Sequence, residues 1–101
     1  MTSDPRVVDN PASSRFEVEV DGHLAELVYR RDGGRLVLIH TEVPRALEGH
    51  GLGGLLVTAA LAYAAEKNLS VVPVCAFARG WLERHPGIAA RARIEWPADL
   101  S

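Results

Sequence analysis

Apolar and acidic side chains alternate strictly over residues 16–20. Phe16, Val18 and Val20 occupy the even positions, and glutamates occupy the odd ones. A period of two predicts a strand with one buried face. Asp21-Gly22 follows, a dipeptide typical of two-residue hairpin turns because both positions tolerate positive φ.

Two more strands extend this hairpin into a sheet. Residues 23–31 form the predicted partner strand, and Asp32-Gly33-Gly34 makes a second turn. Residues 35–43 include the run Leu36-Val37-Leu38-Ile39, which is apolar on both faces and therefore typical of a central strand. The first half of the chain is expected to form a three-stranded antiparallel meander.

The periodicity changes in the second half of the chain. Over residues 52–65, apolar side chains recur every three or four positions, which predicts a helix, and Asn68 suits its left-handed C-terminal position. Residues 69–75 then form a short buried strand, parallel to the third strand because a helix joins the two. Pro73 cannot donate to the ladder, so it implies a bulge or an unpaired position.

A second helix is expected over residues 76–84, with Phe77, Trp81 and Leu82 turned inward. His85-Pro86-Gly87 ends it. The elements together predict an α+β (mixed α/β) fold, in which an antiparallel meander is followed by a helix, a parallel strand and a second helix.

The length of 101 residues suits one domain, which we place at residues 15–101. Residues 1–14 carry two prolines and no apolar pattern, so a flexible N-terminal arm is expected there. The tail, residues 88–96, fits a further strand, and residues 89–93 within it fit a helix equally well.

Charge and composition narrow the class of protein. The 11 basic and 13 acidic residues give a net charge of −2, which argues against a nucleic-acid-binding protein. The longest nearly apolar window, residues 52–65, is too short to cross a bilayer, and no apolar export signal is visible, so a cytoplasmic protein without membrane partners is expected. A lone cysteine, Cys75, excludes an internal disulfide, and the four histidines lack metal-ligand spacing, so no metal site is expected.

The connection between the third strand and the long helix is rich in glycine. Gly49, Gly51, Gly53 and Gly54 fall within six residues. The first turn of a helix has backbone N–H groups without internal partners, and glycines let that backbone approach an anion, so a phosphate or pyrophosphate is one natural ligand. A turn that merely needs small residues is the alternative. The triplet Gly-Lys-Ser/Thr of a P-loop does not occur.

Residues 43–56 resemble the acetyl-CoA-binding motif of the GNAT superfamily of N-acetyltransferases, Arg/Gln-x-x-Gly-x-Gly/Ala. Gly51 and Gly53 fill its last two places, while Glu48 replaces the usual Arg or Gln. The short single-domain group of this superfamily is the closest match, over about residues 16–87. Its other motifs occur here in the same order, as His40-Thr41-Glu42-Val43-Pro44, Pro73-Val74-Cys75 and Trp81-Leu82-Glu83-Arg84-His85-Pro86.

The resemblance implies a GNAT-like fold and transfer of an acetyl group from acetyl-CoA to an amine, with the acceptor, a small molecule or a protein, unidentified. It also implies a set of cofactor-binding residues, with Val43 offering backbone bonds to pantetheine and the glycine turn holding the pyrophosphate: Val43, Glu48, Gly49, His50, Gly51, Leu52, Gly53 and Gly54.

Three residues are candidates for catalysis. Cys75 follows the fourth strand, where the thioester is expected, and can act as a proton donor to the leaving thiolate, as a nucleophile, or simply as a small buried residue. His40 and Glu42 share one face of the third strand and form either a base relay that deprotonates the amine or a solvated pair.

Two further functions compete with an acetyltransferase. One is a non-catalytic CoA-binding or thioester-sensing module, and the other is a small interaction domain whose glycines serve only the turn. The hairpin at Asp21-Gly22 leaves no room for the helices that shape the acceptor side in larger GNAT enzymes, so pairing into a homodimer is a further expectation.

Overall fold

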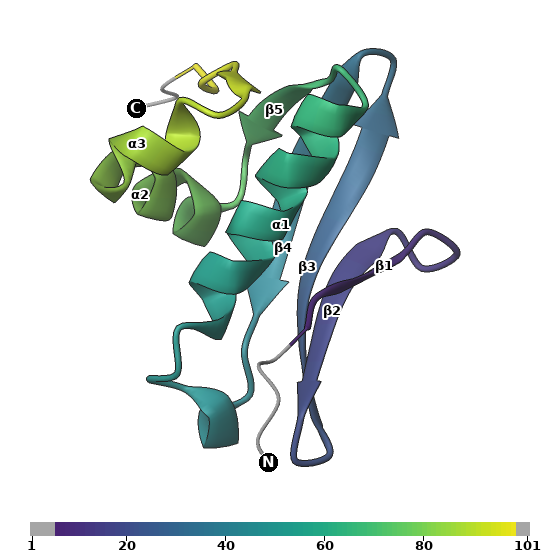
Figure 1. Ribbon diagram of the computed structural model, residues 1–101, viewed down its shortest axis with the longest axis vertical. Coiled ribbons are helices and arrows are strands. Elements are labelled where there is room, and N and C mark those ends of the chain that lie inside the picture. The colour runs from purple at the N-terminus through teal and green to yellow at the C-terminus, as the bar shows by residue number, and fades with distance from the viewer. Residues whose placement is uncertain (1–5, 99–101) are drawn as a thin grey trace.

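The computed structural model describes residues 6–98, which fold into one mixed sheet with helices packed against it (Figure 1). The sheet has six strands in the order β1-β2-β3-β4-β5-β6. Their bounds are Val8–Asn10, Arg15–Val20, His23–Asp32, Arg35–Glu42, Ser70–Pro73 and Arg93–Ile94. The helices are a 3₁₀ turn, η1 (Arg45–Leu47), and α1 (Leu52–Glu66), α2 (Ala76–Arg84) and α3 (Pro86–Ala89).

The predicted meander is confirmed. β2, β3 and β4 pair antiparallel in sequence order, and the Asp21-Gly22 turn has positive φ at both residues, 51° and 79°. Phe16 and Val18 of β2 are buried, as their alternation with glutamates predicts. The sequence pattern therefore sets both the turn and the face of the sheet that meets the core.

The predicted crossover is confirmed as well. α1 lies along β4 in Figure 1 and returns the chain to β5, which pairs parallel with β4. Asn68, just after the helix, has φ 59°, the left-handed conformation expected at a helix C-terminus. No helix among residues 6–98 has the length and apolar character needed to span a bilayer.

A single hydrophobic cluster holds the helices on the sheet. It joins Leu27 and Leu38 of the sheet to Leu56 of α1 and Leu82 of α2, all at most 1% exposed. Burying one such leucine contributes about 1.5–3 kcal/mol. Val37 points to the opposite face of β4 and lies outside this cluster, although it is also buried.

The prediction of a flexible arm over residues 1–14 is wrong for the part that the structure describes. Residues 8–10 form β1, which pairs antiparallel with β2, and the Tyr29 hydroxyl donates to Asp9 Oδ1 at 2.6 Å. A three-residue strand held by a ladder and one tyrosine leaves no apolar periodicity in the sequence, so the pattern could not show it. Residues 1–5 of the predicted arm and residues 99–101 of the predicted domain lie outside the described residues.

The tail ends in a short strand within the predicted range, whereas the helix lies earlier than the predicted residues 89–93. Pro86–Ala89 forms the one-turn helix α3, with Pro86 at its first position, and Arg93–Ile94 forms β6, parallel to β5. α2 ends at Arg84, immediately before His85-Pro86, as predicted.

Candidate functional site

Strand β4 continues beyond its partner β5. The two strands pair only from Arg35 to Leu38 of β4, and the last bond runs from the Cys75 amide to the Leu38 carbonyl at 2.8 Å. β4 itself runs on to Glu42 while still paired with β3 on its other side. Within residues 6–98, the edge of β4 over residues 39–42 therefore has no strand partner on the β5 side and can offer backbone N–H and C=O groups to an extended ligand.

Two local irregularities separate the strands. At Pro73 the ladder ends, and the Val74 amide turns back to the Val72 carbonyl at 3.0 Å, as expected of a proline that cannot donate. In β4, Ile39 is an extra residue, because His40 and Leu38 face consecutive residues of β3. A bulge of this kind bends a strand and redirects its side chains.

The glycine turn, residues 49–54, connects η1 to α1 and includes the first residues of that helix. Gly49 and Gly51 have φ of 86° and 73°, a conformation that favours glycine, and a side chain at either would meet open space. Gly51 is the N-cap of α1 and provides no side-chain cap. Because Leu55 is the first residue whose amide bonds back to Gly51, the amides of Leu52, Gly53 and Gly54 have no partner within the helix.

Gly53 and Gly54 have a second role, in helix packing. A Cβ on Gly53 would lie 2.4 Å from the ring of Phe77, and one on Gly54 would lie 2.7 Å from the indole nitrogen of Trp81. The two rings of α2 therefore occupy the notch that these glycines leave. Two of the four glycines thus serve the backbone of the turn, and the other two admit aromatic rings.

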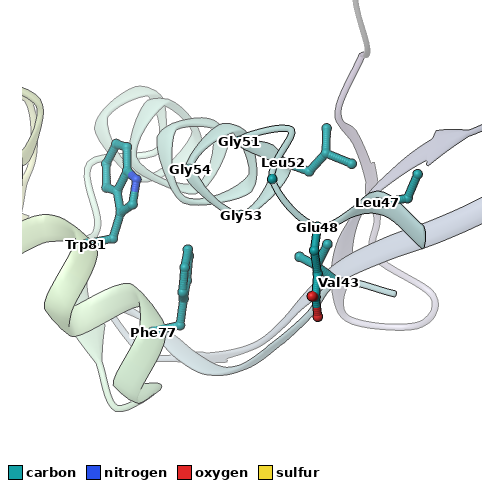
Figure 2. A pocket seen from close by; sticks show the side chains of 10 residues that line it. Val43, Leu47, Glu48, Gly51, Leu52, Gly53, Gly54, Phe77 and Trp81 are labelled. Atoms are coloured by element: carbon teal, nitrogen blue, oxygen red, sulfur yellow. The ribbon is translucent and has the colours of Figure 1, made fainter. Parts of the chain in front are cut away.

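A hollow of about 330 Å³ lies in front of the glycine turn. Figure 2 shows Phe77 and Trp81 on one side of it and Val43 and Glu48 on the other. Its lining consists of Val43, Leu47, Glu48, Gly49, Gly51, Leu52, Gly53, Gly54, Phe77 and Trp81. Seven of the eight predicted cofactor residues line this hollow, and the exposed His50 does not.

Leu47, Phe77 and Trp81 also line the hollow, although sequence analysis did not assign them to it. The prediction that Phe77 turns into the core is wrong, because its side chain is 40% exposed at the wall of the hollow. One signal in the sequence pointed this way. Two adjacent glycines at the start of one helix leave room for large side chains, and the next helix carries two aromatic residues four positions apart, on one face.

The structure divides the three candidate catalytic residues between two faces of the sheet. Cys75 is 7% exposed, and its Sγ lies 3.2 Å from Thr41 Oγ1 beside the gap between β4 and β5. His40 Nε2 lies 3.3 Å from Glu42 Oε1, and both side chains are exposed. Because neighbours along a strand point to opposite faces, Thr41 shares the helix-covered face with Cys75, whereas His40 and Glu42 share the other. Thr41 was not predicted as a site residue.

Comparisons with known proteins agree on one family. The family model described as GCN5-related N-acetyl-transferase matches residues 15–91, more than half of the chain. The Protein NATD1 sequences of Mus musculus and Homo sapiens are each 33% identical to this chain over 84 residues. That alignment covers 80% of this chain and 76% and 74% of the two relatives.

A solved structure resembles the whole fold. The NMR solution structure of a GCN5-like protein from Staphylococcus aureus superimposes with a TM-score of 0.72 at 26% sequence identity. The match covers 98% of this chain and 96% of that one. The two chains thus share their fold almost end to end.

Proposed function

Because this chain belongs to the GCN5-related N-acetyltransferase family, we propose that it transfers an acetyl group from acetyl-CoA to the amine of an acceptor. The family and the fold support an acyltransferase function. Acetyl-CoA as the donor, an amine as the acceptor and the roles of individual residues are what we propose. One observation carries it. The hollow is lined by the uncapped first turn of α1 and by Val43, the residue that directly follows the β4 edge without a partner in β5.

Backbone groups in and beside the hollow could bind the diphosphate and the pantetheine arm of acetyl-CoA. The free amides of Leu52, Gly53 and Gly54, at the positive end of the α1 dipole, would bind the diphosphate. The β4 edge from residue 39 to Val43 would bond the amides of the pantetheine arm. That path brings the thioester towards Thr41 and Cys75, where β4 and β5 part.

The transfer needs one new bond and two proton movements. The amine nitrogen attacks the thioester carbonyl carbon, the C–N bond forms and the C–S bond breaks. We assign the uptake of the amine proton to His40, oriented by Glu42, on the face of the sheet opposite the helices. The Cys75 thiol, close to Thr41, would protonate the leaving thiolate or carry the acetyl group as a thioester in between.

Release of free CoA thiol tests the proposal. The chain is incubated with acetyl-CoA and a panel of amines that includes polyamines, amino acids and lysine-containing peptides. We expect one class to raise thiol release above the amine-free rate, and His40→Ala to reduce that increase. CoA binding without acceleration by any amine would contradict transfer and favour a thioester-sensing module.

A further inference from the structure

The indole ring of Trp81 is held rigidly beside the first turn of α1. On one side it stacks on His85, with ring centroids 3.9 Å apart and planes 15° apart. The His85 ring is itself fixed, because its Nδ1 donates to the Trp81 carbonyl at 2.7 Å. On the other side the indole nitrogen fits against Gly54, 2.7 Å from where a Cβ would be. Such a ring loses little freedom when it binds a ligand.

The indole N–H is a donor without an acceptor in the described part of the chain. None of the hydrogen bonds among residues 6–98 uses it. It is not sealed in the core either, since every fully buried side-chain nitrogen or oxygen of these residues has a partner. Trp81 lines the hollow, and Figure 2 shows its nitrogen on the side of the ring nearer the glycine turn. An indole nitrogen can only donate, so its partner in the hollow must be an acceptor.

We propose that the Trp81 indole N–H donates a hydrogen bond to a phosphate oxygen of CoA, beside the free amides of Leu52, Gly53 and Gly54. The inference rests on the proposed use of acetyl-CoA. It adds one side-chain donor to a diphosphate-binding site whose other proposed donors are backbone amides. Glu48 in place of Arg or Gln leaves the turn without a cationic or amide partner at that position. Trp81 supplies a neutral donor from the opposite wall of the hollow.

The test compares ligands with and without the diphosphate. Calorimetry measures the affinity of the wild type and of Trp81→Phe, which keeps an aromatic ring and removes the N–H, for CoA and for pantetheine. A bond to a charged acceptor predicts that Trp81→Phe weakens CoA binding by about tenfold. Pantetheine, which has no phosphate, should bind both proteins equally. Trp96→Phe is the matched control, because Trp96 is exposed and does not line the hollow.

A second readout is the indole N–H resonance of the wild type. In the wild type, CoA should shift the proton resonance of the Trp81 indole N–H downfield, and pantetheine should not. The Trp96 indole resonance identifies any nonspecific effect. Trp81→Phe then serves to assign the two indole resonances.

Failure of this inference differs from failure of the proposed function. If CoA shifts the amides of residues 51–55 while the Trp81 indole stays in place and Trp81→Phe binds normally, Trp81 only packs against Gly54. If CoA shifts neither the amides nor the indole, the proposed use of acetyl-CoA is wrong, and this inference is wrong with it.

Discussion

At the scale of single residues, Glu48 is the main departure from the sequence motif of the family. Its side chain lines the hollow on the side opposite Phe77 and Trp81, which form the aromatic wall (Figure 2). A negative charge close to a diphosphate opposes its binding, although solvent screens an exposed group such as this one. Glu48 would therefore limit the affinity of the proposed site for the diphosphate of CoA.

Removing this charge should tighten binding. Glu48→Gln is expected to bind CoA about three- to tenfold more tightly at low ionic strength, with a smaller gain as salt is raised. Calorimetry at two salt concentrations measures both effects. Glu66→Gln, at the far end of α1, is the control for the change in net charge and should bind as the wild type does. Equal affinity of Glu48→Gln and the wild type at low salt would show that the carboxylate does not face the ligand.

Cys75 is the second residue whose role can be decided directly. If its thiol carries the acetyl group, incubation with acetyl-CoA adds one acetyl mass to the protein, and Cys75→Ala prevents that gain. Mass spectrometry of the intact protein measures both. A wild type that gains no mass, combined with turnover in Cys75→Ala close to normal, would show that the residue only packs beside Thr41.

At the scale of elements, the contact between α1 and α2 depends on two missing side chains. Alanine at position 53 would overlap the ring of Phe77. Because the overlapping atoms are the outer end of a partly exposed ring that can move aside, and because alanine favours helix more than glycine does, Gly53→Ala should lower the free energy of unfolding by only about 1 kcal/mol. Urea denaturation measures the loss, and Gly87→Ala in α3, which would meet open space, is the control.

The same contact makes a prediction about coupling. In a Phe77→Ala background the clash is absent, so Gly53→Ala should cost nothing or stabilise the protein slightly. An equal loss in both backgrounds would show that Gly53 is required for another reason.

β1 is joined to β2 by a small polar network at the sheet edge. Arg15 forms an ion pair with Glu17, and Asn10 donates to Glu17 Oε2 at 3.1 Å. The bond from Arg15, followed by the bond from Asn10, lowers the pKa of the Glu17 carboxyl below its ordinary value. A lowered pKa in the folded state stabilises the protein above the unfolded pKa, and that stabilisation is lost as pH falls through the folded value.

Glu17→Gln should accordingly destabilise the protein at pH 7 and have little effect once the pH is below the lowered pKa of Glu17 in the folded state. Denaturation of both proteins at neutral and acidic pH measures the difference. A gap between them that stays constant with pH would mean that the charge of Glu17 does not stabilise the fold.

At the scale of the whole molecule, patterns with a clear period were predictable from the sequence, whereas single contacts were not. The alternation around Phe16 and Val18 and the left-handed Asn68 gave the sheet and the helix correctly. β1 was missed because its order comes from a ladder and one bond to Tyr29 rather than from apolar residues. The motif placed the glycine turn correctly, while the aromatic wall and Thr41 depend on contacts between distant segments that no local pattern encodes.

The two faces of the sheet differ in what covers them. Both crossovers, β4-α1-β5 and β5-α2-α3-β6, connect neighbouring parallel strands, and right-handed connections of this kind place their helices on the same face. The hydrophobic cluster lies on that face, whereas His40 and Glu42 lie on the other. In the proposed reaction CoA binds where the helices and β4 meet, and the amine approaches from the helix-free face.

Mapping the amides that respond to CoA tests this account most directly. The chain is labelled with ¹⁵N and titrated with CoA while the amide resonances are recorded. The largest shifts are expected at residues 49–55 and along the β4 edge from residue 39 to Val43. Shifts confined to any other surface, or none at millimolar CoA, would contradict it.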